Sequence, residues 1–176
     1  MNVWRPCDAV ETVFAWKAAI ERIDGPTSLV FSRQSLPSMK RTEGAINEIL
    51  KGGYIVFEVG PKPDVLIIAT GSEVSLGVAV AEKFSKRGVS IQVVSMPCAE
   101  IFEAQSKAYR DLVLPPEVTK RVAIEAAHTM FWHKYVGPEG AIVGIDSFGA
   151  SAPGEKLFAR YGFTSENIAE AIQGIL

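Results

Sequence analysis

An unbroken apolar run at residues 65–69, Val-Leu-Ile-Ile-Ala, is the feature that most restricts how this chain can fold. A run this short, without alternating polar residues, is typical of a strand that is covered on both faces. A Thr-Gly-Ser turn follows, and apolar side chains then recur at helical spacing until an Arg-Gly pair. A second apolar run stops at Pro97. The stretch 64–97 therefore predicts two parallel strands joined by a helix.

The residues after Pro97 predict further layers on the same sheet. The expected elements are helices over 99–112 and 130–135, strands over 121–126 and 141–146, and a last helix capped by Thr164 or Ser165. The 176 residues are enough for one good core and an appendage. The fold class is α/β: a three-layer domain with a mostly parallel sheet, preceded by a partial α/β segment.

That partial segment is residues 1–34, which read as strand, helix and strand. Asp8 and Glu11 have the spacing of a capping box at the start of the helix, and residues 28–31 read as a buried strand. Two strands and one helix cannot bury their own apolar faces, so the rest of their sheet is expected elsewhere. Residues 35–62 are rich in glycine and proline and read as a linker, with a short edge strand over 54–58.

Composition excludes several classes of function. The formal net charge is −2 and the basic residues are scattered, which argues against nucleic acid or an anionic membrane as partner. No apolar run reaches the roughly 18 residues of a membrane-spanning helix, and the N-terminus does not read as a signal peptide. Cys7 and Cys98 lie in no metal or redox spacing, so two free thiols in a reducing, cytoplasmic setting are expected.

Two candidate sites have plainer explanations. The turn from Thr70 to Glu73 leads from a strand into a helix and can present backbone N–H groups to a phosphate. It has a single glycine and an acidic residue, so an ordinary capped helix start is favoured. His128 and His133 are five residues apart, which does not place both on one side of a helix. Even with Glu125 nearby, two surface histidines are favoured over a metal site.

The aromatic neighbours of the histidines, Trp132 and Tyr135, are expected in the core or an interface. Asp146 follows a predicted strand and is expected to form a turn. Arg33 is the polar residue of greatest interest, because it follows a predicted strand on the side where open α/β sheets bind ligands. A guanidinium there can hold a phosphate or carboxylate, and a structural ion pair is the alternative. The residues alone define no catalytic triad or paired carboxylates.

Longer segments of the chain resemble the C-terminal part of transketolase. The most specific motifs are SRQ followed by LP, ATGSEV, VSMP and FGASAP. Together they resemble transketolase more than its relatives, 1-deoxyxylulose-5-phosphate synthase and the β chains of 2-oxo acid dehydrogenases. The resembling segments follow the family's order over essentially the whole chain: 3–21, 24–37, 69–84, 93–105, 109–126, 134–153 and 157–168.

The resemblance implies a homodimeric, thiamin-diphosphate-dependent enzyme that moves a two-carbon ketol unit between sugar phosphates. Residues 1–34 would be the end of the pyrimidine-binding domain, 35–62 a linker and 63–176 the C-terminal domain. Arg33 matches the family arginine that binds the substrate phosphate. No other site residue is carried over, so thiamin diphosphate and Mg²⁺ (or Ca²⁺) are expected only in a full-length enzyme.

The resemblance also implies a role for the chain. It is expected to lack activity by itself and to serve folding, dimer support and binding of the substrate phosphate. The alternative is a stand-alone α/β module that binds a ligand or a partner without catalysis.

Overall fold

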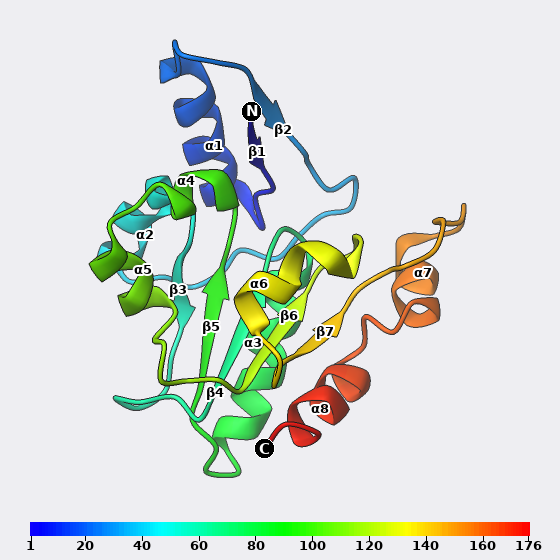
Figure 1. The fold of residues 1–176 in the computed structure, drawn as a ribbon. Coiled ribbons are helices and arrows are strands. Elements are labelled where there is room, and N and C mark those ends of the chain that lie inside the picture. Colours follow the sequence, from blue (N-terminus) through cyan, green and yellow to red (C-terminus); the bar gives the residue numbers. More distant parts are fainter.

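The computed structural model describes residues 1–176 and contains two separate sheets (Figure 1). The larger sheet has five strands in the order β3-β5-β4-β6-β7. All neighbouring strands pair in parallel except the edge strand β3, which is antiparallel to β5, so the predicted α/β fold with a mostly parallel sheet is confirmed. The strands are β3 (Tyr54–Phe57), β4 (Val65–Ala69), β5 (Ile91–Ser95), β6 (Arg121–Ile124) and β7 (Ala141–Val143).

The predicted strand–helix–strand unit is formed by β4, α3 (Glu73–Ser85) and β5. The two strands run in parallel with Val65 opposite Ile91, and every residue of both is buried. In the middle of α3, a Cβ added to Gly77 would lie 3.1 Å from the side chain of Ile67. The absence of a side chain at Gly77 therefore lets the helix pack close to the sheet.

Alternate residues of β4 face opposite layers, as the pleat of a strand requires. Ile67 packs in a core with side chains of α3 and α8 (Ser165–Gln173). Ile68 packs in a second core on the opposite side of the sheet. That core includes Phe102 and Trp132, which follow β5 and β6 in the chain. The sheet is thus the middle of three layers, as predicted (Figure 1).

Several predicted elements are present with different bounds. The helix expected over 99–112 is two helices, α4 (Ala99–Glu103) and α5 (Lys107–Val113), because the side chain of Ser106 caps a new helix start. The helix expected over 130–135 is a 3₁₀ turn followed by α6 (His133–Val136). The last two helices are α7 (Gly154–Arg160) and α8, and Thr164 is the residue that caps α8.

Residues 1–34 form the smaller sheet, in which β1 (Asn2–Trp4) pairs in parallel with β2 (Thr27–Leu29), and α1 (Ala9–Glu21) connects them. The strand expected to be buried over 28–31 is shorter and only partly covered: Val30 and Phe31 are each 46% exposed. The prediction of a buried strand was wrong because two strands offer no second layer above it. Three apolar side chains of α1, Val13, Trp16 and Ile20, are also exposed.

The connection between the two sheets is not a bare linker. Residues 35–62 contain α2 (Glu43–Glu48), a 3₁₀ turn (Ile49–Lys51) and β3, which is the expected edge strand. Cys7 and Cys98 are both free and buried, in line with two unpaired thiols. None of the helices is long and apolar enough to cross a membrane.

Candidate functional site at the carboxyl edge of the sheet

The start of the chain lies across the carboxyl ends of the central strands. The N–H of Arg5 donates to the carbonyl of Pro97 (2.8 Å), just after β5. The carbonyl of Arg5 accepts from the N–H of Gly71 (3.1 Å) and from the hydroxyl of Thr70 (3.4 Å), just after β4. Open α/β sheets bind ligands at this edge, and here residues 1–34 occupy part of it.

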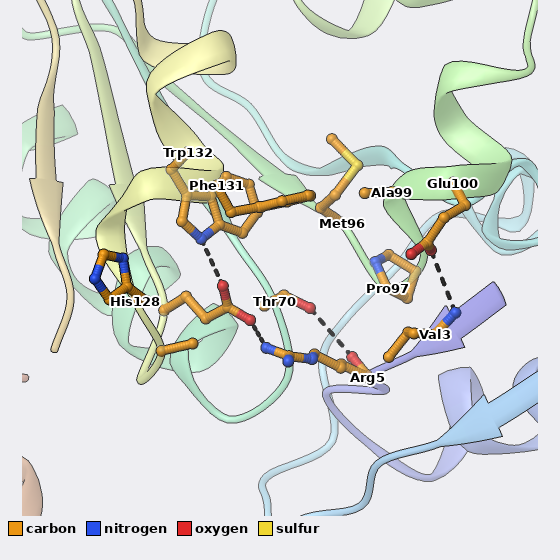
Figure 2. A pocket seen from close by; sticks show the side chains of 12 residues that line it. Val3, Arg5, Thr70, Met96, Pro97, Ala99, Glu100, His128, Phe131 and Trp132 are labelled. Carbon is orange, nitrogen blue, oxygen red and sulfur yellow. Dashed lines mark hydrogen bonds and ion pairs between the residues drawn. The ribbon is translucent and has the colours of Figure 1, made fainter. Parts of the chain in front are cut away.

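A pocket of about 310 Å³ is lined by Arg5 together with Trp132 and Glu100 (Figure 2). The Arg5 guanidinium forms an ion pair with Glu125, and the indole N–H of Trp132 donates to the same carboxylate (2.6 Å). On the other side, Glu100 accepts from the N–H of Val3 (3.2 Å). Arg5 and Glu125 are therefore paired with each other, Glu100 accepts from a backbone N–H, and Trp132 is a buried core residue as expected.

A second hollow, of about 240 Å³, lies at the start of α3 and contains the buried carboxyl of Glu73. Burial raises the pKa of Glu73, although a hydrogen bond from the Ser72 hydroxyl (3.1 Å) and the charge of Arg5 oppose the shift. The acidic residue of this turn is thus buried at the helix start, where its carboxyl occupies the side of the hollow that a phosphate would need. The Ser72 side chain bonds Glu73 rather than a backbone N–H, so the expected capped helix start has no side-chain cap.

The raised pKa of Glu73 makes stability depend on pH. Above its ordinary value of 4.5, the folded chain retains a proton on Glu73 that the unfolded chain has released. Folding then takes up a proton, so the free energy of unfolding falls as pH rises from about 4.5 toward the folded pKa. In a Glu73→Gln variant we expect this decline to be absent. Urea unfolding at a series of pH values measures it, with the exposed Glu82→Gln on the same helix as control. Equal slopes in the parent and in Glu73→Gln would contradict the expectation.

The histidines do not form a metal site with their neighbours. His128 and His133 are both exposed, and no group of three or more His, Cys, Asp or Glu side chains is placed to hold a metal ion. The carboxylate of Asp146 accepts from the N–H (3.0 Å) and hydroxyl (2.9 Å) of Thr129. Asp146 was expected to form its own turn; instead it joins the loop after β7 to the loop after β6, and the N–H of Thr129 lowers its pKa.

Arg33 stands close to this edge. It is exposed, and it takes part in none of the ion pairs of the chain. Its neighbours Phe31 and Ser32 line the same hollow as Thr70 and Glu73, which places the segment beside the carboxyl end of β4. The guanidinium is therefore a cation without an acidic partner within this chain, and the alternative of a structural ion pair finds no support.

Sequence reasoning missed a buried polar network that joins the two sheets. The guanidinium of Arg41 donates to both carboxylate oxygens of Asp8 (2.6 and 3.1 Å), and both side chains are only 1% exposed. Arg41 also donates to the hydroxyl of Tyr54 (2.7 Å), which donates to Glu11 (2.7 Å). The hydroxyl of Ser95, at the end of β5, donates to the same Glu11 oxygen (2.6 Å). One network thus connects α1, the linker and two strands of the large sheet.

The network explains the shifted pKa values around it. Burial by itself would raise the pKa of Asp8, but hydrogen bonds from Arg41 and from the N–H groups of Met39 and Glu11 hold it below its usual range. Burial raises the pKa of Tyr54, which therefore remains a donor to Glu11. Glu11 also departs from the expected capping box, because its carboxylate accepts from the N–H of Cys7 (2.7 Å). A sequence signal for the network, besides the Asp8 and Glu11 pair, was Ser95, a polar residue at the end of a buried strand.

The sequence and the structure of this chain are both similar to those of known proteins. The family described as Transketolase-like TK C-terminal domain matches residues 52–164. The chain is 51% identical over its whole length to Transketolase 1 of Vibrio parahaemolyticus and covers 26% of that protein. Its structure is similar to transketolase from Leishmania mexicana, with a TM-score of 0.89, 39% identity and coverage of 99% of this chain and 25% of that one.

A transketolase from Pichia stipitis in complex with sedoheptulose-7-phosphate is similarly close. The TM-score is 0.88 at 37% identity, and the match covers 99% of this chain and 25% of that one. The chain thus spans about a quarter of the length of the relatives that it matches.

Proposed function

Because the chain belongs to the transketolase family and matches its C-terminal domain, we propose that it forms the C-terminal quarter of a thiamin-diphosphate-dependent transketolase. The enzyme would transfer a two-carbon ketol unit from a ketose phosphate to an aldose phosphate. The observation that carries the proposal is the match itself: every part of this chain, including residues 1–34, aligns with one contiguous quarter of the relatives.

The exposed apolar side of α1 supports this assignment. Val13, Trp16 and Ile20 face solvent, although burial of such side chains is worth about 1.5–3 kcal/mol each. In the proposed parent enzyme, residues 1–34 are the end of the pyrimidine-binding domain, and the preceding strands of that domain cover this side. Residues 35–62 then connect the two domains and supply the edge strand β3 to the sheet of the C-terminal domain, which otherwise comprises residues 63–176, in a cytoplasmic homodimer.

The cofactor would be held outside this chain. No cluster of side chains here suits a metal ion, so the residues present do not fit a diphosphate–metal site, and no step of the reaction is derived through them. Thiamin diphosphate and a divalent cation would bind the preceding domains. When bound, thiamin diphosphate supplies the carbanion chemistry that such a transfer needs.

The contribution of this chain to substrate binding would come from Arg33. Its guanidinium is exposed and has no acidic partner in the chain, so its donors are free to meet a phosphate. Arg–phosphate pairs are frequently bidentate and combine charge with geometric specificity. Arg33 would therefore bind the phosphate of the sugar without touching the bonds that react.

The proposal is tested by joining this chain to the preceding three-quarters of the V. parahaemolyticus relative. We expect the chain alone, given thiamin diphosphate and Mg²⁺, not to turn over xylulose 5-phosphate, and the joined protein to do so. In the joined protein, Arg33→Gln is expected to lower kcat/KM for xylulose 5-phosphate by about 10–150-fold, the value of a charge-assisted hydrogen bond of about 1.5–3 kcal/mol. The unphosphorylated sugar xylulose is the matched control and should be unaffected.

Two results would contradict the proposal. Turnover by the chain alone would show that the missing domains are not needed. Equal losses for xylulose 5-phosphate and xylulose in Arg33→Gln would remove Arg33 from phosphate binding. The stand-alone module is distinguished by an immunoblot of source cells, in which it requires a band at 19.0 kDa and the parent enzyme a much larger one.

A further inference from the structure

Arg33 lies in residues 31–38, a segment that we call the arch, and few contacts within the chain hold this segment in place. No backbone group of residues 31–38 takes part in a hydrogen bond within the chain. A hollow of about 260 Å³, lined by residues of the arch and by Asp8 and Thr12, separates the arch from the start of α1. Neither a hydrogen-bond ladder nor close packing therefore fixes the arch, so its position depends on what holds its ends.

The first end is held by β1 and α1. The N–H of Val30 donates to the carbonyl of Trp4 (2.8 Å), and the ring of Phe31 stacks on Trp16 with centroids 6.3 Å apart. Next to Arg33 itself, the side chain of Gln34 lies against Gly154 at the start of α7, where an added Cβ would approach its amide to 2.7 Å. The contact between Gln34 and Gly154 thus involves a side chain near the middle of the arch and no backbone group of it.

The second end is held by the buried ion pair of Asp8 and Arg41. The N–H of Met39, the first residue beyond the arch, donates to Asp8 (2.9 Å), and the carbonyl of Met39 accepts from Arg41 (3.1 Å). Both backbone groups of Met39 are thus bound by the same two buried side chains. Asp8 in turn is fixed on α1, because it accepts from the N–H of Glu11 (3.0 Å).

We propose that Asp8 and Arg41 are positioning residues for binding of the substrate phosphate. They hold the arch in the position in which the Arg33 guanidinium contacts the phosphate. This inference rests on the proposed role of Arg33. Ordering a loose loop on binding reduces affinity, and a small misplacement of a binding group lowers the rate steeply. The pair would act through Arg33 and would not touch the substrate.

The test uses the joined protein with Arg41→Lys, which keeps a positive charge beside the buried carboxylates but lacks the fork that reaches Asp8 and Tyr54 together. We expect KM for xylulose 5-phosphate to rise about tenfold with kcat within about twofold, and the kinetics with xylulose to be unchanged. Ile172→Val in the core of α8 is the control, because it lowers stability away from the arch and should alter neither substrate selectively.

A second pair of variants keeps the test decisive if Arg41→Lys does not fold. Met39→Pro removes the N–H that donates to Asp8 while leaving the ion pair in place, and Met39→Ala retains that N–H. In the isolated chain, cleavage by trypsin after the exposed Arg33 should be several-fold faster in Met39→Pro than in Met39→Ala. In the joined protein, only Met39→Pro should raise KM for xylulose 5-phosphate.

The outcomes separate this inference from the function on which it rests. If Arg33→Gln has no effect selective for the phosphorylated sugar, the roles of Arg33 and of the positioning pair are both overturned. If Arg33→Gln has that effect, but Arg41→Lys and Met39→Pro leave KM unchanged, only the positioning role is overturned.

Discussion

An Arg41→Met variant of this chain is expected to lose about 3–5 kcal/mol of its free energy of unfolding, the cost of removing one partner of a buried ion pair. Arg41 donates to both oxygens of Asp8 and to Tyr54, and its side chain is 1% exposed. Methionine fills much of the same volume but leaves the Asp8 carboxylate without a cation. Because whole domains are stable by only about 5–15 kcal/mol, the loss is measurable as a large fall in the urea midpoint.

The matched control is Lys107→Met, which removes a cation from the ion pair between Lys107 and Asp111 on the surface of α5. The Lys107 side chain is 77% exposed, and such pairs contribute at most about 1 kcal/mol. Similar losses in the two variants would show that the network of Arg41 does not hold the two sheets together. We expect a much larger loss for Arg41→Met and weaker protection of α1 from hydrogen exchange. Both results would support a role for the network in holding the two sheets together.

Gly52→Ala is expected to be the second severe substitution, with a loss of about 2–5 kcal/mol. Gly52 has a φ of +82°, a left-handed conformation that costs a residue with a side chain about 1–2 kcal/mol. A Cβ there would also lie 2.3 Å from the carbonyl oxygen of Cys98 and 2.6 Å from the nitrogen of Phe102. Both are backbone atoms around α4, so the clash requires a helix to move and adds a further cost of about 1–3 kcal/mol.

Gly88→Ala separates the two causes, because Gly88 has nearly the same φ, +83°, and no atom within 4 Å of an added Cβ. It should lose only the conformational part, about 1–2 kcal/mol. Thermal unfolding of the two variants side by side gives the comparison. Equal shifts in Tm for Gly52→Ala and Gly88→Ala would mean that α4 moves away from the new methyl group without loss of stability.

The central architecture could be predicted from sequence because it depends on local patterns. Five consecutive apolar residues can be satisfied only by burial on both faces, and the helix after them shows its apolar side through spacing. The order of the five strands in the large sheet, in contrast, depends on contacts between residues far apart in the chain. The antiparallel addition of β3 beside β5 has no signature within residues 54–57.

Several of the errors in prediction arise because polar side chains form hydrogen bonds that the apolar spacing of the sequence does not reveal. Ser106 starts a new helix by capping it, and so divides the predicted helix over 99–112. Asp146 bonds Thr129, 17 residues away, rather than its own turn. Arg41 lies within residues 35–62, which read as a linker, and only the folded chain shows that its side chain is buried.

The candidate site also contains residues that the sequence could indicate and residues that it could not. Arg33 could be singled out because it follows a predicted strand; in the structure that strand ends at Leu29 in the smaller sheet, and the neighbours of Arg33, Phe31 and Ser32, lie beside the carboxyl end of β4 in the larger one. The ion pair of Arg5 with Glu125 could not be foreseen, because 120 residues separate the partners. Its formation depends on how residues 1–34 lie across the sheet.

The network that joins the two sheets also sets an order of events during synthesis on the ribosome. Glu11 accepts from Ser95, which is 84 positions later in the chain, so at about 5–20 residues per second this partner emerges roughly 4–17 s later. Until then the carboxylates of α1 remain hydrated, and the apolar side of the helix is available to chaperones. The N-terminal segment therefore becomes locked late, when the second strand of the parallel pair has left the exit tunnel.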